Sequence, residues 1–217
     1  NGPAIAGVNY NDTLYGEGDN DTIYGGLGDD SLNGGGGDDT FRGQAGNDII
    51  DGDTGTNTID FSDATATGVT VYLDGTDGAG VAVAYQVMAD GFGGKDKVTS
   101  VTKVIGSGLK DTLKGTSGDD VLQAGAGDDF IISTGGADTV DGGANTTNTG
   151  GGDWLSFQLI TTSNTADPDG YTGVRANMSG GALSSGLGST NISGIENIKG
   201  TIFKDLITGD TGDNSLD

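Results

Sequence analysis

Aspartates recur in this chain at a spacing that favours binding of a metal ion by oxygen. In the first 60 residues an acidic or amide side chain stands at the sixth place of each nine-residue unit. These residues are Asp12, Asp21, Asp30, Asp39, Asp48 and Asn57. Ca²⁺ takes such oxygen ligands at about 2.3–2.6 Å, in a flexible six- to eight-fold shell. The residue type and its repetition therefore indicate cation chemistry.

The same unit carries glycine at its first place and an apolar residue at its eighth. The glycines are Gly7, Gly16, Gly25, Gly34, Gly43 and Gly52. The apolar residues are Leu14, Ile23, Leu32, Phe41, Ile50 and Ile59. Glycine is abundant, 45 of 217 residues, but abundance alone does not hold three columns in phase over six units. Such a period is typical of a parallel β-helix.

The elements that must position the aspartates follow from the unit itself. Its last three residues suit a short strand whose eighth place points inward, and its first six suit a turn in which glycine supplies positive φ. Two units then form one coil of 18 residues, with stacked strands about 4.8 Å apart. Sixth-place side chains two units apart lie above one another. Asp12, Asp30 and Asp48 form one column, and Asp21, Asp39 and Asn57 form the other.

A column of ionised carboxylates at this spacing repels itself unless a cation lies between the coils. Ca²⁺ suits the gap better than Mg²⁺, which requires a tight octahedron at about 2.0–2.1 Å. Carbonyls of the turn glycines are candidates to complete the shell, namely Gly25, Gly28, Gly34, Gly37, Gly43, Gly46, Gly118 and Gly127. Counting adjacent pairs predicts about six or more ions, whose charge opposes the acidic excess. We expect a chain that is disordered without calcium and folded with it.

The pattern returns twice. From Gly106 the sixth place holds Asp111, Asp120, Asp129 and Asp138, and Asp153 resumes the pattern after an insertion. We expect a first block over 1–60, a connecting β segment over 61–105, a second block over 106–155 with an insertion near 142–152, a second connecting segment over 156–199 and the start of a third block over 200–217. The connecting segments alternate apolar and polar residues, as strands do. Further coils of the same solenoid and a small sheet packed beside it both fit this pattern.

Composition excludes several classes of function. Nine basic residues against 32 acidic ones, a net charge of −23, argue against binding to nucleic acid or anionic membranes. The chain contains no Cys and no His, so it lacks thiol chemistry and the usual general base. We find no hydrophobic stretch long enough to insert into a membrane. The ends suggest a piece of a longer protein.

The units resemble the RTX (repeats-in-toxin) nonapeptide Gly-Gly-x-Gly-x-Asp-x-apolar-x. Gly25 to Asn33 and Gly34 to Arg42 are the nearest copies, whereas Tyr10, Asp19 and Leu109 replace the fourth-place glycine. The resemblance implies an all-β fold, a right-handed parallel β-roll with Ca²⁺ in its turns, and sixth-place Asp residues as ligands. It also implies export by a type I secretion machine, followed by folding outside the cell.

Three functions compete. The first is a structural segment of a large secreted or cell-surface protein of the adhesin or surface-layer type, with a surface glycan or self-association as its contact. The second is an accessory module of a type I-secreted enzyme, such as a polysaccharide-modifying enzyme, protease or lipase. The third, ice binding, needs a more regular Thr/Asn face than the fifth place offers. Paired carboxylates such as Asp29-Asp30 belong to the repeat, so we expect no catalysis. Mutation of Asp30 or Asp39 is expected to matter far more than mutation of Asp74, which lies outside the columns.

Overall fold

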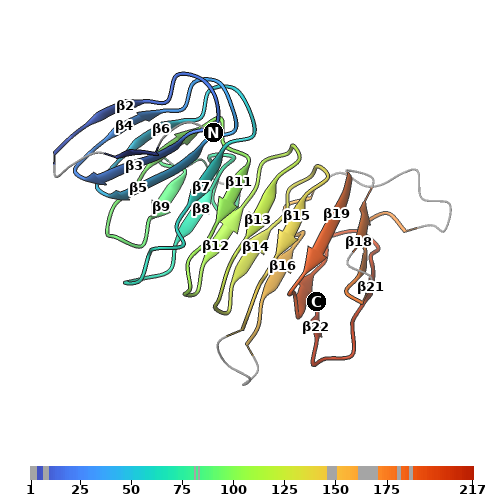
Figure 1. Ribbon diagram of the computed structural model, residues 1–217. Coiled ribbons are helices and arrows are strands. Elements are labelled where there is room, and N and C mark those ends of the chain that lie inside the picture. The colour runs from blue at the N-terminus through green and yellow to red at the C-terminus, as the bar shows by residue number, and fades with distance from the viewer. Residues whose placement is uncertain are drawn as a thin grey trace.

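The computed structural model describes residues 4–6, 10–80, 82, 84–145, 151–160, 171–179, 182–185 and 188–217. Over these residues the chain consists of short strands joined by turns, and no helix is present. Figure 1 shows the strands following one another from the blue N-terminal block to the red C-terminal strands. Gly7 and residues 146–150 of the expected insertion lie outside the described part.

The strands form three sheets. The long sheet contains, in spatial order, β1 (Ala4–Ala6), β3 (Thr22–Leu27), β5 (Thr40–Ala45), β7 (Thr58–Asp60), β11 (Lys103–Ile105), β13 (Val121–Gln123), β15 (Thr139–Asp141), β19 (Gly188–Ser193), β18 (Ala182–Ser185), β17 (Arg175–Asn177) and β21 (Leu206–Thr208). The short sheet contains β10 (Lys97–Thr99), β6 (Ile49–Asp51), β4 (Ser31–Asn33) and β2 (Thr13–Tyr15). The third sheet contains β22 (Ser215–Leu216), β20 (Asn197–Lys199), β16 (Trp154–Ser156), β14 (Phe130–Ile132), β12 (Thr112–Lys114), β8 (Thr70–Tyr72) and β9 (Val87–Ala89).

The register confirms that two nonapeptides make one coil. Leu32 of β4 pairs in parallel with Leu14 and with Ile50, and Phe41 of β5 pairs with Ile23 and Ile59. Each partner is 18 residues away, so the nine-residue units alternate between two facing sheets. The fold is a parallel β-roll, as the sequence predicts.

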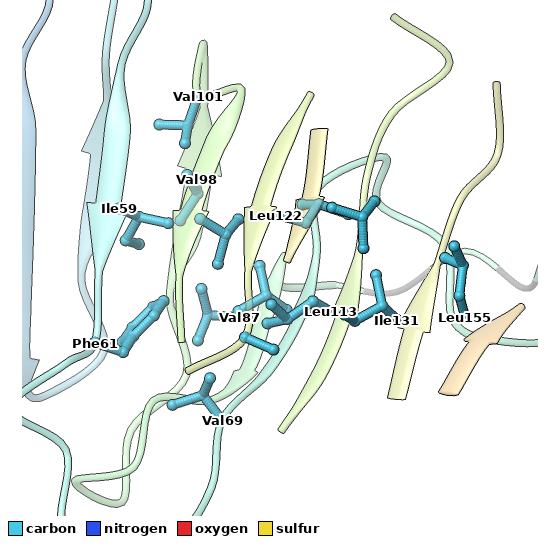
Figure 2. Packing of buried hydrophobic residues seen from close by; sticks show 14 of the residues in the cluster. Ile59, Phe61, Val69, Val87, Val98, Val101, Leu113, Leu122, Ile131 and Leu155 are labelled. Carbon is cyan, nitrogen blue, oxygen red and sulfur yellow. The ribbon is translucent and has the colours of Figure 1, made fainter. Parts of the chain in front are cut away.

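The core lies between the facing sheets and is built from the eighth-place side chains. Phe41 is fully buried, and so are Ile23, Ile59, Leu113 and Leu122. Figure 2 shows how this stack continues past the first block, with Phe61, Val69, Val87, Val98, Val101, Ile131 and Leu155 among the labelled side chains. One continuous apolar row therefore holds the coils together.

The connecting segment after β7 contains both further coils of the solenoid and a small added sheet, the two possibilities that the sequence left open. Strands β10 and β11 pair in parallel with β6 and β7 and are further coils of the roll. Strands β8 and β9 pair antiparallel and begin the third sheet beside β12. Residues 61–96 thus add strands to one side of the roll only. Figure 1 shows the direction of the strands changing at this place, between the blue strands and those that follow.

A buried lysine anchors the loop that follows β8. The Lys114 side chain on β12 is 1% exposed and its Nζ donates to the carbonyls of Thr76 and Asp77 at 3.2 and 3.0 Å. Asp74 Oδ2 lies 2.9 Å from the same nitrogen. Removing one member of a buried ion pair is costly. Asp74 is therefore a poor neutral control, and Asp53, exposed in a turn, is the better choice.

Candidate metal sites

The sixth-place aspartates stand above one another because each supports the backbone of the coil before it. The backbone N–H of Asp12 donates to Asp30 Oδ1 at 2.8 Å, and that of Asp30 donates to Asp48 Oδ1 at 2.9 Å. In the other column Asp21 donates in the same way to Asp39 at 2.9 Å. The predicted columns are present, and one oxygen of each accepting carboxylate is used in this stacking.

The second oxygen of these carboxylates has no hydrogen-bond donor. Oδ2 is buried and unpartnered in Asp21, Asp30, Asp39 and Asp48, and these side chains are between 0% and 3% exposed. Burying an unpaired ionised oxygen is strongly unfavourable. The ion pairs of Arg42 and Lys114 are made with other carboxylates. These oxygens therefore require a cation or a proton.

Glycine at the first place leaves room for such a cation. A Cβ on Gly25 would lie 2.6 Å from both Asp30 Oδ2 and the Gly43 carbonyl oxygen of the next coil. On Gly16 it would lie 2.6 Å from Asp21 Oδ2. A side chain would collide with both oxygens, whereas a calcium ion takes a carboxylate and a carbonyl together. The donor set fits calcium.

Glycine at the fourth place is required by the stacking of the turns. Gly46 has φ of 142°, in the region that side chains avoid, and a Cβ there would meet the Gly28 carbonyl of the preceding coil. Asp19 replaces this glycine in the second unit and adopts φ of 71°, a left-handed conformation that Asp tolerates. The turn therefore survives this departure from the pattern.

The family comparison agrees with this geometry. The model of the RTX calcium-binding nonapeptide repeat matches four copies, at residues 5–32, 24–59, 105–140 and 192–217, which together span more than half of the chain. The chain belongs to the RTX family. RTX repeats bind Ca²⁺, so this is a calcium-binding β-roll of structural, noncatalytic repeats. A search of curated proteins found no match.

The candidate ligands combine carboxylates with backbone carbonyls. Among the residues that the structure describes, no group of three or more acidic side chains is arranged to hold a metal by itself. Each gap between coils instead offers carboxylates and turn carbonyls, such as Asp30 Oδ2 and the carbonyl of Gly43. No helix of the described chain is long and apolar enough to cross a membrane.

Burial changes the protonation of the columns. Desolvation raises the pKa of Asp48 to about 7, assisted by the neighbouring Asp30 and Asp90. It raises the pKa of Asp129 to about 7 and that of Asp138 to about 6. Without a metal ion, these carboxyls hold protons more readily than they do in an unfolded chain.

Stability without calcium is therefore expected to fall as pH rises. The folded chain binds more protons than the unfolded one, so stabilisation by protonation is complete below the ordinary Asp value of 3.8 and is lost as pH passes the raised pKa values of about 6 to 8. Saturating calcium reverses the trend, because ligands must be ionised. Urea midpoints from pH 4 to pH 8.5 in calcium, and from pH 4 upward in chelator for as long as the chain stays folded, measure both slopes. A midpoint in chelator that is constant or rises with pH would contradict the assignment.

The second block differs from the first in its use of hydroxyl groups. Asp111 accepts from the Ser107 backbone N–H and from its hydroxyl, each at 2.7 Å, so both carboxylate oxygens are bonded. Asp138 Oδ2 accepts from the Ser133 hydroxyl at 2.7 Å. These local donors bond to carboxylate oxygens whose counterparts in the first block have no protein donor. We expect Asp111 and Asp138 to depend least on calcium.

Other sixth-place aspartates of this block keep an unpartnered oxygen. Asp120 retains Oδ1 without a partner, while its Oδ2 accepts from Thr116. Asp129 and Asp153 retain Oδ2. The column continues beyond Asp153, whose backbone N–H donates to Glu196 Oε2 at 2.8 Å. Glu196, which the sequence did not mark, stands where the next sixth-place ligand belongs.

Asn57 ends its column differently from an aspartate. Its Oδ1 accepts from the Asp39 backbone N–H at 2.9 Å, and its amide nitrogen donates to the Ser100 carbonyl at 3.0 Å. The amide donor occupies the position that faces the next coil. This geometry argues against Asn57 as a ligand on that side.

One nine-residue unit lies out of phase with the others and is not apparent when the sequence is divided in a single fixed phase. Residues 91–99 read Gly-Phe-Gly-Gly-Lys-Asp-Lys-Val-Thr, with Asp96 at the sixth place and buried Val98 at the eighth. They lie three residues out of phase with the first block and outside the matched ranges. A search for the motif in every phase, rather than in one fixed phase, finds this unit.

Proposed function

We propose that this RTX segment is a calcium-folded structural part of a large secreted or cell-surface protein of the adhesin or surface-layer type. The observation that carries the proposal is the row of buried Oδ2 atoms in Asp21, Asp30, Asp39 and Asp48, which lack protein donors. RTX repeats typically occur in secreted proteins, which supports an extracellular location. Calcium is abundant there and scarce in the cytosol.

Export through a type I secretion machine fits the same chemistry. A chain whose stacked carboxylates repel one another stays expanded while calcium is scarce, and an expanded chain passes through a narrow channel. After release, each occupied site stabilises the roll by about 2.7 kcal/mol at a hundredfold excess of calcium over Kd. We propose about six or more ions, concentrated in the first block where hydroxyl donors do not replace them. A glycan or a second copy of the chain is the proposed surface contact.

Small-angle X-ray scattering with and without calcium tests the folding step. An unfolded chain of this length has a radius of gyration of about 50 Å, and a compact one has roughly 20 Å. We expect the large value in chelator and with Mg²⁺, and the small value at millimolar Ca²⁺. A chain that is compact in chelator at neutral pH would remove the basis for calcium-timed folding outside the cell.

A further inference from the structure

The short-sheet column extends one coil beyond the first matched block. The Asp48 backbone N–H donates to Asp96 Oδ1 at 2.9 Å, and Lys97 N–H donates to the Asp48 carbonyl at 2.8 Å. The column stops at Asp96, because the Asp96 backbone N–H donates to the Val87 carbonyl at 3.0 Å and not to another carboxylate. Asp96 is therefore the last carboxylate of the column formed by Asp12, Asp30 and Asp48.

A carboxylate from outside the repeats closes this end. Asp90 Oδ1 accepts three backbone N–H groups, from Phe92, Gly93 and Gly94, at 2.7, 2.8 and 2.9 Å. Three donors fix the orientation of the carboxyl group firmly. The side chain is 1% exposed, and its Oδ2 has no donor. Asp90 is thus held rigidly with one buried oxygen unpaired.

That oxygen lies beside a second acceptor. A Cβ on Gly94 would collide with both Asp90 Oδ2 and the Gly46 carbonyl oxygen, so the two oxygens share the space that glycine leaves. The Oδ2 atoms of Asp48 and Asp96 are also buried and unpartnered. Arg42 and Lys114 form their ion pairs with Asp60, Asp63 and Asp74, and not with these carboxylates.

The column formed by Asp21, Asp39 and Asn57 ends in a hydrogen bond that needs no cation. There Asn57 presents an amide donor to the Ser100 carbonyl at 3.0 Å, so acceptor meets donor. At the Asp96 end, by contrast, the added residue brings a further acceptor and a further negative charge. Only a cation or a proton reconciles these groups.

We propose that Asp90, together with Asp96 and the Gly46 carbonyl, forms a calcium site that fastens the inserted segment to the end of the first roll. Within the described residues no three acidic side chains are grouped to hold a metal, so the proposed site uses two carboxylates and a backbone carbonyl. Asp90 lies outside the nonapeptide pattern, and Asp96 lies outside the matched ranges. The proposal rests on the calcium-binding function of the roll.

The test is Asp90→Asn in the full 217-residue chain, with Asp53→Asn as the matched control. Asparagine keeps Oδ1 for the three N–H groups, so the turn is retained, and replaces the charged Oδ2 with an amide nitrogen that cannot bind a cation. Equilibrium dialysis against Ca²⁺ is expected to find one ion fewer per chain in Asp90→Asn and no change in the control. Hydrogen exchange of the peptide 84–96 is expected to lose its calcium-dependent protection in Asp90→Asn alone. In chelator at pH 5, where protonation supports the fold, Asp90→Asn is expected to be at least as stable as the wild type.

The outcomes separate the two levels of the argument. A wild-type chain that binds no calcium would overturn the function of the whole roll. A wild type that binds calcium, with Asp90→Asn binding as many ions and protecting 84–96 equally, would overturn the Asp90 site alone. If Asp90→Asn fails to fold in calcium, Asp96→Asn replaces it, because its Oδ1 still accepts from Asp48, and the same ion count decides.

Discussion

Asp39→Ala is expected to lower the stability of the calcium-loaded roll strongly. Asp39 is 0% exposed and accepts the Asp21 backbone N–H at 2.9 Å. Alanine leaves that buried N–H unsatisfied, at a cost of about 1–3 kcal/mol. It also removes a ligand, which forfeits about 2.7 kcal/mol per lost ion at a hundredfold excess of calcium. Urea unfolding at saturating Ca²⁺ measures the sum.

Asp39→Asn divides this loss into its two parts. The amide oxygen still accepts from Asp21, so the stacking hydrogen bond is retained while the charge is lost. We expect reduced stability in calcium but no loss in chelator, where the substitution removes a buried carboxylate whose pKa desolvation already raises. Asp53→Asn, in an exposed turn, serves as the control and is expected to change neither value. Equal losses for Asp39→Asn and Asp53→Asn in calcium would contradict a ligand role for Asp39.

Phe41→Ala is expected to destabilise the roll whether or not calcium is bound. Phe41 is fully buried and stacks between Ile23 and Ile59 in adjacent coils. Truncating a buried Phe typically costs about 3–5 kcal/mol, because the cavity closes only partly. We expect Phe41→Ala to lower the free energy of unfolding by a similar amount in calcium and in chelator at pH 5, where protonation supports the fold.

The control for the core is Ile49→Ala. Ile49 precedes the buried Ile50 in β6 and is 55% exposed, so its loss is expected to cost less than about 1 kcal/mol. Equal costs at Phe41 and Ile49, measured by urea unfolding, would mean that the eighth-place row does not form the core.

The sequence predicts the roll well because its nine-residue period sets both the strand pairing and the direction of each side chain. Strand pairing 18 residues apart follows from two nine-residue units per coil, so Leu14, Leu32 and Ile50 stack as expected. The inward-pointing row of eighth-place apolar residues and the two columns of carboxylates follow from the same spacing of two units per coil. A periodic sequence leaves little freedom to a fold in which each coil contacts only its neighbours.

Prediction fails where the chain departs from the period. The 30 residues 61–90 shift the phase of the next unit by three, so a fixed phase hides Asp96, and Asp90 belongs to no unit at all. Only the pairing of β10 with β6 brings Asp96 onto the column. Nor does the motif reveal that Ser107 satisfies Asp111 locally, because this depends on a side-chain hydrogen bond and not on spacing. Insertions and local donors are decided by three-dimensional contacts.

The most direct test of calcium-gated folding is a far-ultraviolet circular dichroism titration at pH 7.5, from chelator to millimolar Ca²⁺, repeated with Mg²⁺. Buried, unpartnered oxygens in Asp21, Asp30, Asp39 and Asp48 predict a cooperative gain of β signal with Ca²⁺ and little gain with Mg²⁺. A β signal already complete in chelator would contradict the account. In that case the apolar row alone would hold the roll.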